Sequence, residues 1–179
     1  ELYVQGMSRN NAILAATSDI ISFIDADDEM HPNRLEIIQH MFAKEQNLKM
    51  FLHGYTEEHD LGKWRNKKLS SESGNMVGKA ELCKSEARTR QQAHLDLLVQ
   101  HAHVSLRHNM LGGVHFDESR KSHRLEDSLF VRAILADTCK DAGSKEHILF
   151  LDSPLSYYET SRATCAYRNV SIDFSNEHK

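Results

Sequence analysis

The sequence alternates short apolar runs with amphipathic stretches, an order typical of strands that are followed by helices. Residues 20–24 form an apolar run rich in β-branched and aromatic side chains, which predicts a strand buried on both faces. Residues 48–55 alternate well enough for another strand. Between the two strands, apolar residues recur at helical spacing just after Pro32: Leu35, Ile38, Met41 and Phe42. We therefore expect a strand, a helix and a second strand in this order.

The same alternation continues on both sides of this unit. Upstream, residues 2–4 resemble a strand, and Ser8 can cap a helix that runs to about Ala16. Downstream, residues 85–100 predict a helix and residues 102–108 a strand, and Gly112-Gly113 then breaks the pattern. The order of elements predicts an α/β domain with a mixed, mostly parallel sheet flanked by helices.

The last third of the chain predicts one more helix and two strands. The helix begins near Glu126 and places four residues inward: Leu129, Phe130, Ala133 and Ile134. Residues 147–151 and 155–158 are the two expected strands. With 179 residues, no repeat and no linker, we expect a single domain over residues 1–179, in which residues 56–100 are a variable loop and helix region.

Composition and charge narrow the class of protein. The 22 basic and 26 acidic residues give a net charge of -4, so the broad positive field that binds nucleic acid is absent and no nucleic-acid partner is expected. No apolar run is long enough for a transmembrane segment, and the start of the chain lacks a signal-peptide pattern, so a cytoplasmic location is expected. Cys83, Cys139 and Cys165 are odd in number and widely spaced, which favours free thiols over a disulfide framework.

A cluster of acids directly follows the apolar run at residues 20–24. Ligands of open α/β sheets bind at the carboxyl ends of the strands, where Asp25, Asp27 and Asp28 stand. Several neighbouring carboxylates repel one another, which favours a compensating Mg²⁺ or Mn²⁺ ion. A solvated acidic turn before a helix is the alternative. A calcium loop of the EF-hand kind is disfavoured, because Met30 stands where that loop needs glycine.

Two blocks of sequence, taken together, resemble the middle of a family 2 glycosyltransferase with the GT-A fold. The first block is Gly6-Met7-Ser8-Arg9-Asn10-Asn11-Ala12, then Asp19 to Asp28, then Pro32 and Leu35-Glu36. The second block is Gly112-Gly113, Phe116-Asp117-Glu118, Glu126-Asp127 and Arg132. The resemblance covers residues 1–55 and 103–160. It implies an enzyme that moves a sugar from a nucleotide diphosphate donor, such as a uridine diphosphate sugar, to a hydroxyl of a carbohydrate, lipid or protein acceptor.

The resemblance also implies roles for individual residues. Asp25-Ala26-Asp27 matches the Asp-x-Asp motif, with Asp25 and Asp27 at a Mn²⁺ or Mg²⁺ ion that neutralises the departing diphosphate. Asp25 also lies near the ribose in this reading, and Asp28 supports the motif. Arg9 and Asn10 match a pair on the nucleotide side.

The acidic pair of the second block is implied to act on the acceptor. Asp127 matches the catalytic base, which takes the proton of the attacking hydroxyl so that the sugar is transferred with inversion. Glu126 has a structural or acceptor-facing role in this reading. The family begins with further strand–helix units that nothing before Glu1 supplies, so we expect an N-terminally incomplete fragment. A non-catalytic binding or scaffold module is the alternative function.

Two other features have more than one interpretation. Histidines gather near the expected strand at residues 102–108, and they could form a zinc site or simply lie at the surface: His101, His103, His108, His115 and His123. Trp64, in a basic stretch, could stack on a sugar ring or anchor its own loop.

Overall fold

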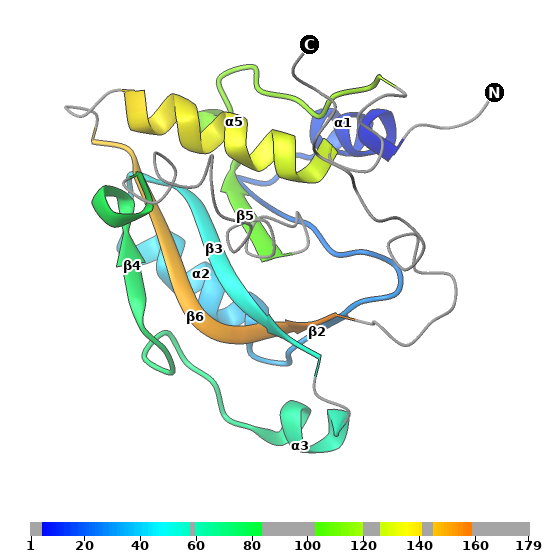
Figure 1. Ribbon diagram of the computed structural model, residues 1–179, viewed down its shortest axis with the longest axis vertical. Coiled ribbons are helices and arrows are strands. Elements are labelled where there is room, and N and C mark those ends of the chain that lie inside the picture. The colour runs from blue at the N-terminus through cyan, green and yellow to red at the C-terminus, as the bar shows by residue number, and fades with distance from the viewer. Residues whose placement is uncertain (1–4, 58–59, 84–102, 120–125, 141–144, 159–179) are drawn as a thin grey trace, which may run out of the picture.

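The computed structural model describes residues 5–57, 60–83, 103–119, 126–140 and 145–158, and shows an α/β domain built around one curled sheet (Figure 1). The helices are α1 (Gln5–Ala15), α2 (Arg34–Lys44), α3 (Leu61–Asn66), the 3-10 helix η3 (His108–Met110) and α5 (Glu126–Lys140). The strands are β1 (Ile20–Ser22), β2 (Glu29–Met30), β3 (Leu48–Thr56), β4 (Met76–Gly78), β5 (Val104–Arg107) and β6 (His147–Tyr157). The expected strand at residues 2–4 and helix at 85–100 lie outside the described residues.

The sheet is mixed, as expected, but most of its strand pairs are antiparallel. The strand order is β1-β5-β3-β6-β2, with β4 also paired to β6. Among the described strands, only β3 and β6 pair in parallel. The prediction of a mostly parallel sheet was therefore wrong.

The reason lies in a strand that is distant in sequence. Both β1 and β3 are antiparallel to β5, so they run in the same direction, and α2 connects them as the sequence pattern predicts. However, β5 comes from much later in the chain and inserts between them. A hydrophobic pattern reveals each strand but not which distant strand will be its neighbour.

Strand β1 is shorter and more exposed than expected. Its three residues are only half-buried, and in the described part of the chain it pairs with β5 alone. The prediction that residues 20–24 are buried on both faces was wrong, because this strand lies at the end of the strand order.

Strand β6 is a single bent strand where the sequence suggested two. Its first half pairs with β4 and its second half with β2, and the register with β3 shifts around Pro154. Figure 1 shows the resulting curl. Gly74 lies against the bend, where an added Cβ would come within 2.0 Å of the Asp152 carbonyl oxygen, so a side chain there would displace the strand.

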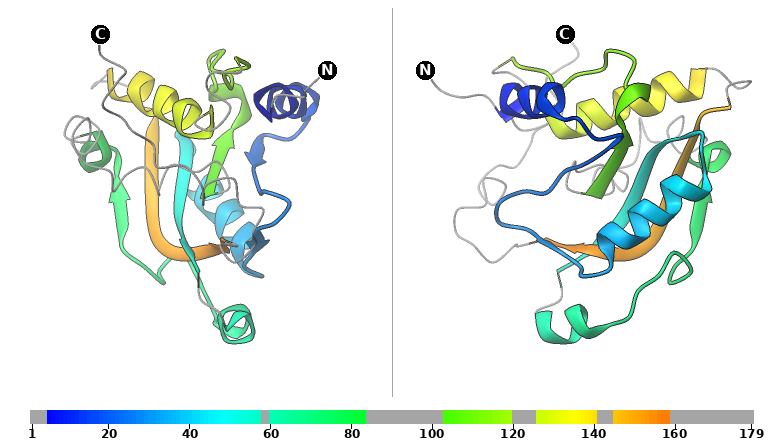
Figure 2. Two further views of the ribbon diagram at one scale, coloured as in Figure 1. Left: turned by 45° about the vertical axis from the view of Figure 1, so that its right-hand side comes forward. Right: turned by 180° about the vertical axis from the view of Figure 1, so that it is seen from behind.

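Helices cover the two faces of the sheet, with α2 on one face and α1 and α5 on the other (Figure 2). Strand β3 is buried along most of its length and contributes apolar side chains to both sides. Three residues that we expected to face inward are exposed: Leu35, Leu129 and Ala133. The buried positions near them are occupied by Ile37, Phe130 and Ile134. None of the described helices is long and apolar enough to cross a bilayer.

Two of the three cysteines form a disulfide, contrary to the expectation of free thiols. Cys83 is bonded to Cys139, near the C-terminal end of α5, across a sequence separation of 56 residues. No short spacing motif marks this pair. The bond depends on the fold, which brings α5 and the segment after β4 together.

Part of the expected variable region at residues 56–100 forms α3 and β4. Trp64 is 2% exposed, and its Nε1 donates to the Pro154 carbonyl oxygen at 2.9 Å. The Trp64 carbonyl oxygen accepts from His31 Nε2 at 3.1 Å, and the two rings meet edge to face. These contacts favour the interpretation that Trp64 anchors its loop against the bend of β6.

The buried imidazole of His53 should make the stability of the fold depend on pH. Burial, together with the nearby positive charge of Arg34 and an electrostatic interaction with His103, lowers the pKa of His53 well below its ordinary value of 6.5. The unfolded chain then binds a proton that the folded chain does not, so stability falls as the pH decreases below about 6.5. We expect a loss of at most about 1.4 kcal/mol per pH unit from this residue, measured by urea denaturation between pH 7.5 and 5.5.

The variant His53→Gln cannot titrate at this position, so its stability should depend less steeply on pH than that of the wild type. His40→Gln, at an exposed position on α2, is the matched control and should keep the wild-type slope. Equal slopes for His53→Gln and the wild type would contradict the prediction.

Candidate functional site

The three aspartates after β1 lie in a tight turn, named here the acid turn (residues 25–28). The Asp28 amide donates to the Asp25 carbonyl oxygen at 3.2 Å and closes the turn. Asp27 is exposed, and Asp25 and Asp28 are half-buried. Carboxylates of the acid turn are therefore presented to solvent a short distance after the end of β1.

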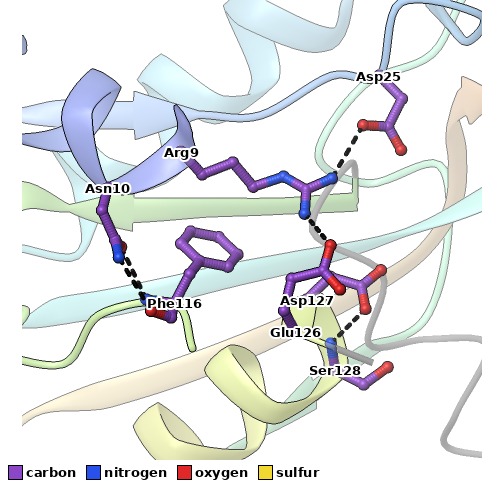
Figure 3. Close-up of polar contacts among 7 residues, drawn as sticks. All are labelled: Arg9, Asn10, Asp25, Phe116, Glu126, Asp127 and Ser128. Atoms are coloured by element: carbon purple, nitrogen blue, oxygen red, sulfur yellow. Dashed lines mark hydrogen bonds and ion pairs between the residues drawn. The ribbon is translucent and has the colours of Figure 1, made fainter. Parts of the chain in front are cut away.

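Arg9 on α1 connects the acid turn to the start of α5 (Figure 3). Its Nη1 donates to Glu126 Oε1 at 2.5 Å, and its Nη2 donates to Asp25 Oδ1 at 3.4 Å. The side chain of Glu126 is 2% exposed, that of Arg9 15% and that of Asp25 39%. The guanidinium thus brings together two acidic groups that are 101 positions apart in the sequence. Its contact with Glu126 is shielded from water, whereas its contact with Asp25 is partly exposed.

The acidic pair forms the first turn of α5, where the positive end of the helix dipole favours negative charge. Both residues are buried, and the Ser128 amide donates to Asp127 Oδ1 at 2.7 Å. Within the described residues, Glu126 Oε2 is buried and has no hydrogen-bond partner. A buried carboxylate oxygen without a donor is costly, which is typical of a position that a ligand or water completes.

Three phenylalanine rings pack together next to Arg9. Phe116 stacks on Phe130 with ring centroids 3.9 Å apart, and Phe23 meets Phe116 edge to face at 5.5 Å. The guanidinium carbon of Arg9 lies 5.5 Å from the centroid of the Phe116 ring. The three rings come from the segment after β1, the loop after η3, and α5, so they tie together the segments that carry the acids.

Asn10 binds protein backbone on both sides of its carboxamide. Its Nδ2 donates to the Phe116 carbonyl oxygen at 2.9 Å and to Glu118 Oε1 at 2.9 Å, and its Oδ1 accepts from the Phe116 amide at 2.8 Å. These bonds fix the loop that carries Phe116 against α1. Gly6 is part of the same contact, because an added Cβ would lie 2.3 Å from the Asp117 carbonyl oxygen.

The described residues contain no group of three or more histidines, cysteines or acids arranged to hold a metal ion. Asp25 and Asp27 fit Mg²⁺ or Mn²⁺ in their chemistry, since they are hard oxygen donors in a solvent-exposed turn. Such ions are commonly held by one or two carboxylates, with water and substrate phosphates supplying the other ligands. Of the histidines considered for zinc, His103 is buried and stacked on Tyr55, while His101 and His123 lie outside the described residues.

Sequence reasoning did not single out Arg34 or the phenylalanine cluster. Arg34 is fully buried, and it occupies the first position of an i, i+3, i+4, i+7 pattern that continues with Ile37, Ile38 and Met41. A cation on the apolar face of a helix is a signal that could have been noticed. The contact between Arg9 and Phe116 has no comparable signal in the sequence, because it depends on how distant segments pack.

The sheet with its flanking helices, and the acid turn beside the acidic start of α5, agree with what the family resemblance implies. The sequence model described as Glycosyl transferase family 2 matches residues 5–111, which is more than half of the chain. The chain therefore belongs to glycosyltransferase family 2, and the resemblance that the sequence suggested is confirmed.

Solved structures of S. aureus TarS share the fold. The structure of TarS 1-349 in complex with UDP matches with a TM-score of 0.56 and 16% identity, covering 86% of this chain and 39% of that chain. The complex with UDP-GlcNAc matches with a TM-score of 0.56 and 18% identity, covering 87% and 39%. The chain thus spans about two fifths of the TarS 1-349 chain. No curated protein matches it.

The ion pair between Arg9 and Glu126 should contribute more to stability than an exposed pair does. We expect a double-mutant cycle with Arg9→Gln and Glu126→Gln to give a coupling free energy above about 1.5 kcal/mol, because a buried charged hydrogen bond exceeds a surface one. Urea denaturation of the four proteins measures it.

The pair between Arg65 and Glu29 is the matched control, since it is also a direct arginine–carboxylate contact but has side chains 48% and 37% exposed. Its cycle should give about 0–1 kcal/mol. A coupling for Arg9 and Glu126 no larger than that of the control would contradict the prediction.

Proposed function

We propose that this chain carries the catalytic portion of a glycosyltransferase that moves a sugar from a uridine diphosphate donor to an acceptor hydroxyl with inversion. The single observation that supports it best is the contact of Arg9 with both Asp25 and Glu126, since it places the acid turn beside the acidic start of α5. The UDP and UDP-GlcNAc bound in the TarS structures support the choice of donor.

Asp127 is the proposed catalytic base. It lies in the first turn of α5, where the helix dipole favours negative charge, and its Oδ1 accepts from the Ser128 amide. A carboxylate there takes the proton of an acceptor hydroxyl as the oxygen attacks the anomeric carbon from the face opposite the diphosphate. The bond to the diphosphate breaks as the new glycosidic bond forms, which inverts the configuration.

The acid turn is the proposed site of the donor diphosphate. Asp27 and Asp25 would hold a Mg²⁺ or Mn²⁺ ion, with Asp28 supporting the turn. When bound, the ion would neutralise charge that develops on the departing diphosphate. Asp27 is the more accessible ligand, because Asp25 is half-buried and already contacts Arg9.

Arg9 and Asn10 have different parts in this proposal. Arg9 faces the space between the two acidic groups, where a fixed cation suits a phosphate oxygen or a base carbonyl. Asn10 acts indirectly, since its carboxamide binds the backbone of Phe116 and thereby places the loop beneath Arg9. Glu126 positions Arg9 through Oε1, and Oε2 is available to an acceptor hydroxyl.

A binding or scaffold module that performs no transfer is the second candidate. The observation that favours it is that Arg9 already compensates part of the negative charge of Asp25 and Glu126, so the fold does not require a metal ion there. UDP binding without sugar transfer or donor hydrolysis in the full-length protein would support this candidate.

The test of the base is Asp127→Asn, which keeps the size of the side chain and removes the charge. We expect kcat for sugar transfer from UDP-GlcNAc by the full-length protein to fall by about 10²–10⁴-fold, because general base catalysis contributes this much. Asp137→Asn on the same helix is the control and should retain transfer, since Asp137 points away to Lys49. Undiminished transfer by Asp127→Asn would refute the assigned role.

The test of the acid turn is Asp27→Ala. Binding of UDP in the presence of Mn²⁺, measured by titration calorimetry, should weaken at least about tenfold, because a carboxylate ligand of the ion is lost. Asp19→Ala, which removes an exposed acid on the other side of β1, is the control and should bind as the wild type does. Equal Mn²⁺-dependent affinities of Asp27→Ala and the wild type would contradict the assignment.

A further inference from the structure

The N-terminal residue of α2, Arg34, is 0% exposed. Burying an arginine side chain completely is unfavourable unless its charge is compensated and its donors are bonded. Burial lowers the pKa of Arg34 to about 10, and the Asp28 carboxylate acts in the opposite direction, so the guanidinium is charged at neutral pH. A charge retained in the interior at such a cost needs partners.

The partners of Arg34 come from three different segments. Its Nη2 donates to the Phe23 carbonyl oxygen at 2.8 Å, and its Nη1 donates to Ser156 Oγ on β6 at 3.1 Å. The third interaction is the electrostatic attraction to Asp28. The planar guanidinium can serve several acceptors in fixed directions, which a lysine ammonium on its flexible stem does less well.

Two of these partners flank the acid turn. Phe23 lies two residues before it and Asp28 is its last residue, so Arg34 interacts with the chain on both sides of Asp25 and Asp27. Repulsion among the three carboxylates favours opening of the turn, and a buried cation beneath it opposes that repulsion. The Ser156 bond in turn connects Arg34 to β6, whose pairing with β3 makes up much of the sheet.

Arg34 and Arg9 therefore act on the acid turn from different sides. Arg9 is partly exposed and contacts Asp25 at 3.4 Å, which leaves it within reach of a ligand. Arg34 is fully enclosed and cannot touch a ligand in the turn. Its effect on a ligand must pass through the conformation of the turn.

We propose that Arg34 is a positioning residue that fixes the acid turn from inside the protein, so that Asp25 and Asp27 are presented together to a divalent cation and a nucleoside diphosphate. The proposal rests on the proposed function for the identity of the ligand. The effect of Arg34 on the conformation of the acid turn does not depend on that function.

The first experiment measures amide hydrogen exchange in the full-length protein carrying Arg34→Gln. Peptides that cover residues 23–30 should exchange about tenfold faster than in the wild type, because a charged hydrogen bond and the compensation of Asp28 are lost. Peptides that cover residues 37–52 should change much less. Equal acceleration in both regions would show that Arg34 only stabilises the fold and would overturn the proposal.

Arg107→Gln is the matched control. Arg107, a half-buried residue of β5, also donates to backbone carbonyl oxygens, those of Leu48 and Phe42, but these lie near the C-terminal end of α2. Its loss should not accelerate exchange in residues 23–30 more than in residues 37–52. Arg34→Lys keeps the charge and should accelerate exchange in the acid turn less than Arg34→Gln does. If Arg34→Gln fails to fold, Arg34→Lys is used instead to compare exchange in residues 23–30 with exchange in residues 37–52.

The second experiment measures binding of UDP with Mn²⁺ by titration calorimetry. Arg34→Gln should weaken Mn²⁺-dependent binding about tenfold, whereas Arg107→Gln should leave it unchanged. Loosening of the turn without any loss of affinity would overturn the positioning role. If the wild type itself binds no UDP, the proposed function fails, and the exchange experiment still decides whether Arg34 fixes the turn.

Discussion

The ion pair between Arg9 and Glu126 is the interaction on which the arrangement of the candidate site depends. It joins α1 to α5 across the top of one face of the sheet, and the same guanidinium extends to Asp25. Removing the cation would leave a buried carboxylate uncompensated beside a second acid, Asp127, in the same helix turn. Phe23, Phe116 and Phe130 exclude water beneath the pair, and Arg34 supports the acid turn from within the fold. The polar groups of the site are thus supported by the phenylalanine rings and by the buried guanidinium of Arg34.

Much of the fold could be predicted from hydrophobic periodicity. Helix α2, strand β3, strand β5 and helix α5 lie where the pattern places them. Gly112 and Gly113, which interrupt the pattern after β5, adopt positive φ values. The α2 connection between two strands of like direction was also predicted. What periodicity could not supply was the insertion of β5 between β1 and β3, since pairing partners are chosen by packing across the whole chain. The disulfide of Cys83 with Cys139 escaped prediction for the same reason.

For the site, the family motifs singled out residues that the fold brings into contact, and their roles stay predictions. Arg9, Asp25 and Glu126 were all singled out from the sequence, but their mutual contact is a property of the folded chain. Asn10 was expected beside the nucleotide, but its carboxamide binds the backbone of Phe116, whereas the neighbouring Arg9 contacts the two acidic groups. The cytoplasmic location stays a prediction, although disulfides persist mainly in oxidising compartments.

Helix α5 is fixed at both of its ends. Near its C-terminal end, Cys139 is covalently bonded to Cys83, and Asp137 accepts from Lys49 of β3 at 3.1 Å. At its first turn, Glu126 accepts from Arg9. The helix can therefore neither slide along its axis nor rotate about it without breaking a bond at one end. We therefore expect α5, and Asp127 with it, to keep its position when neighbouring segments rearrange.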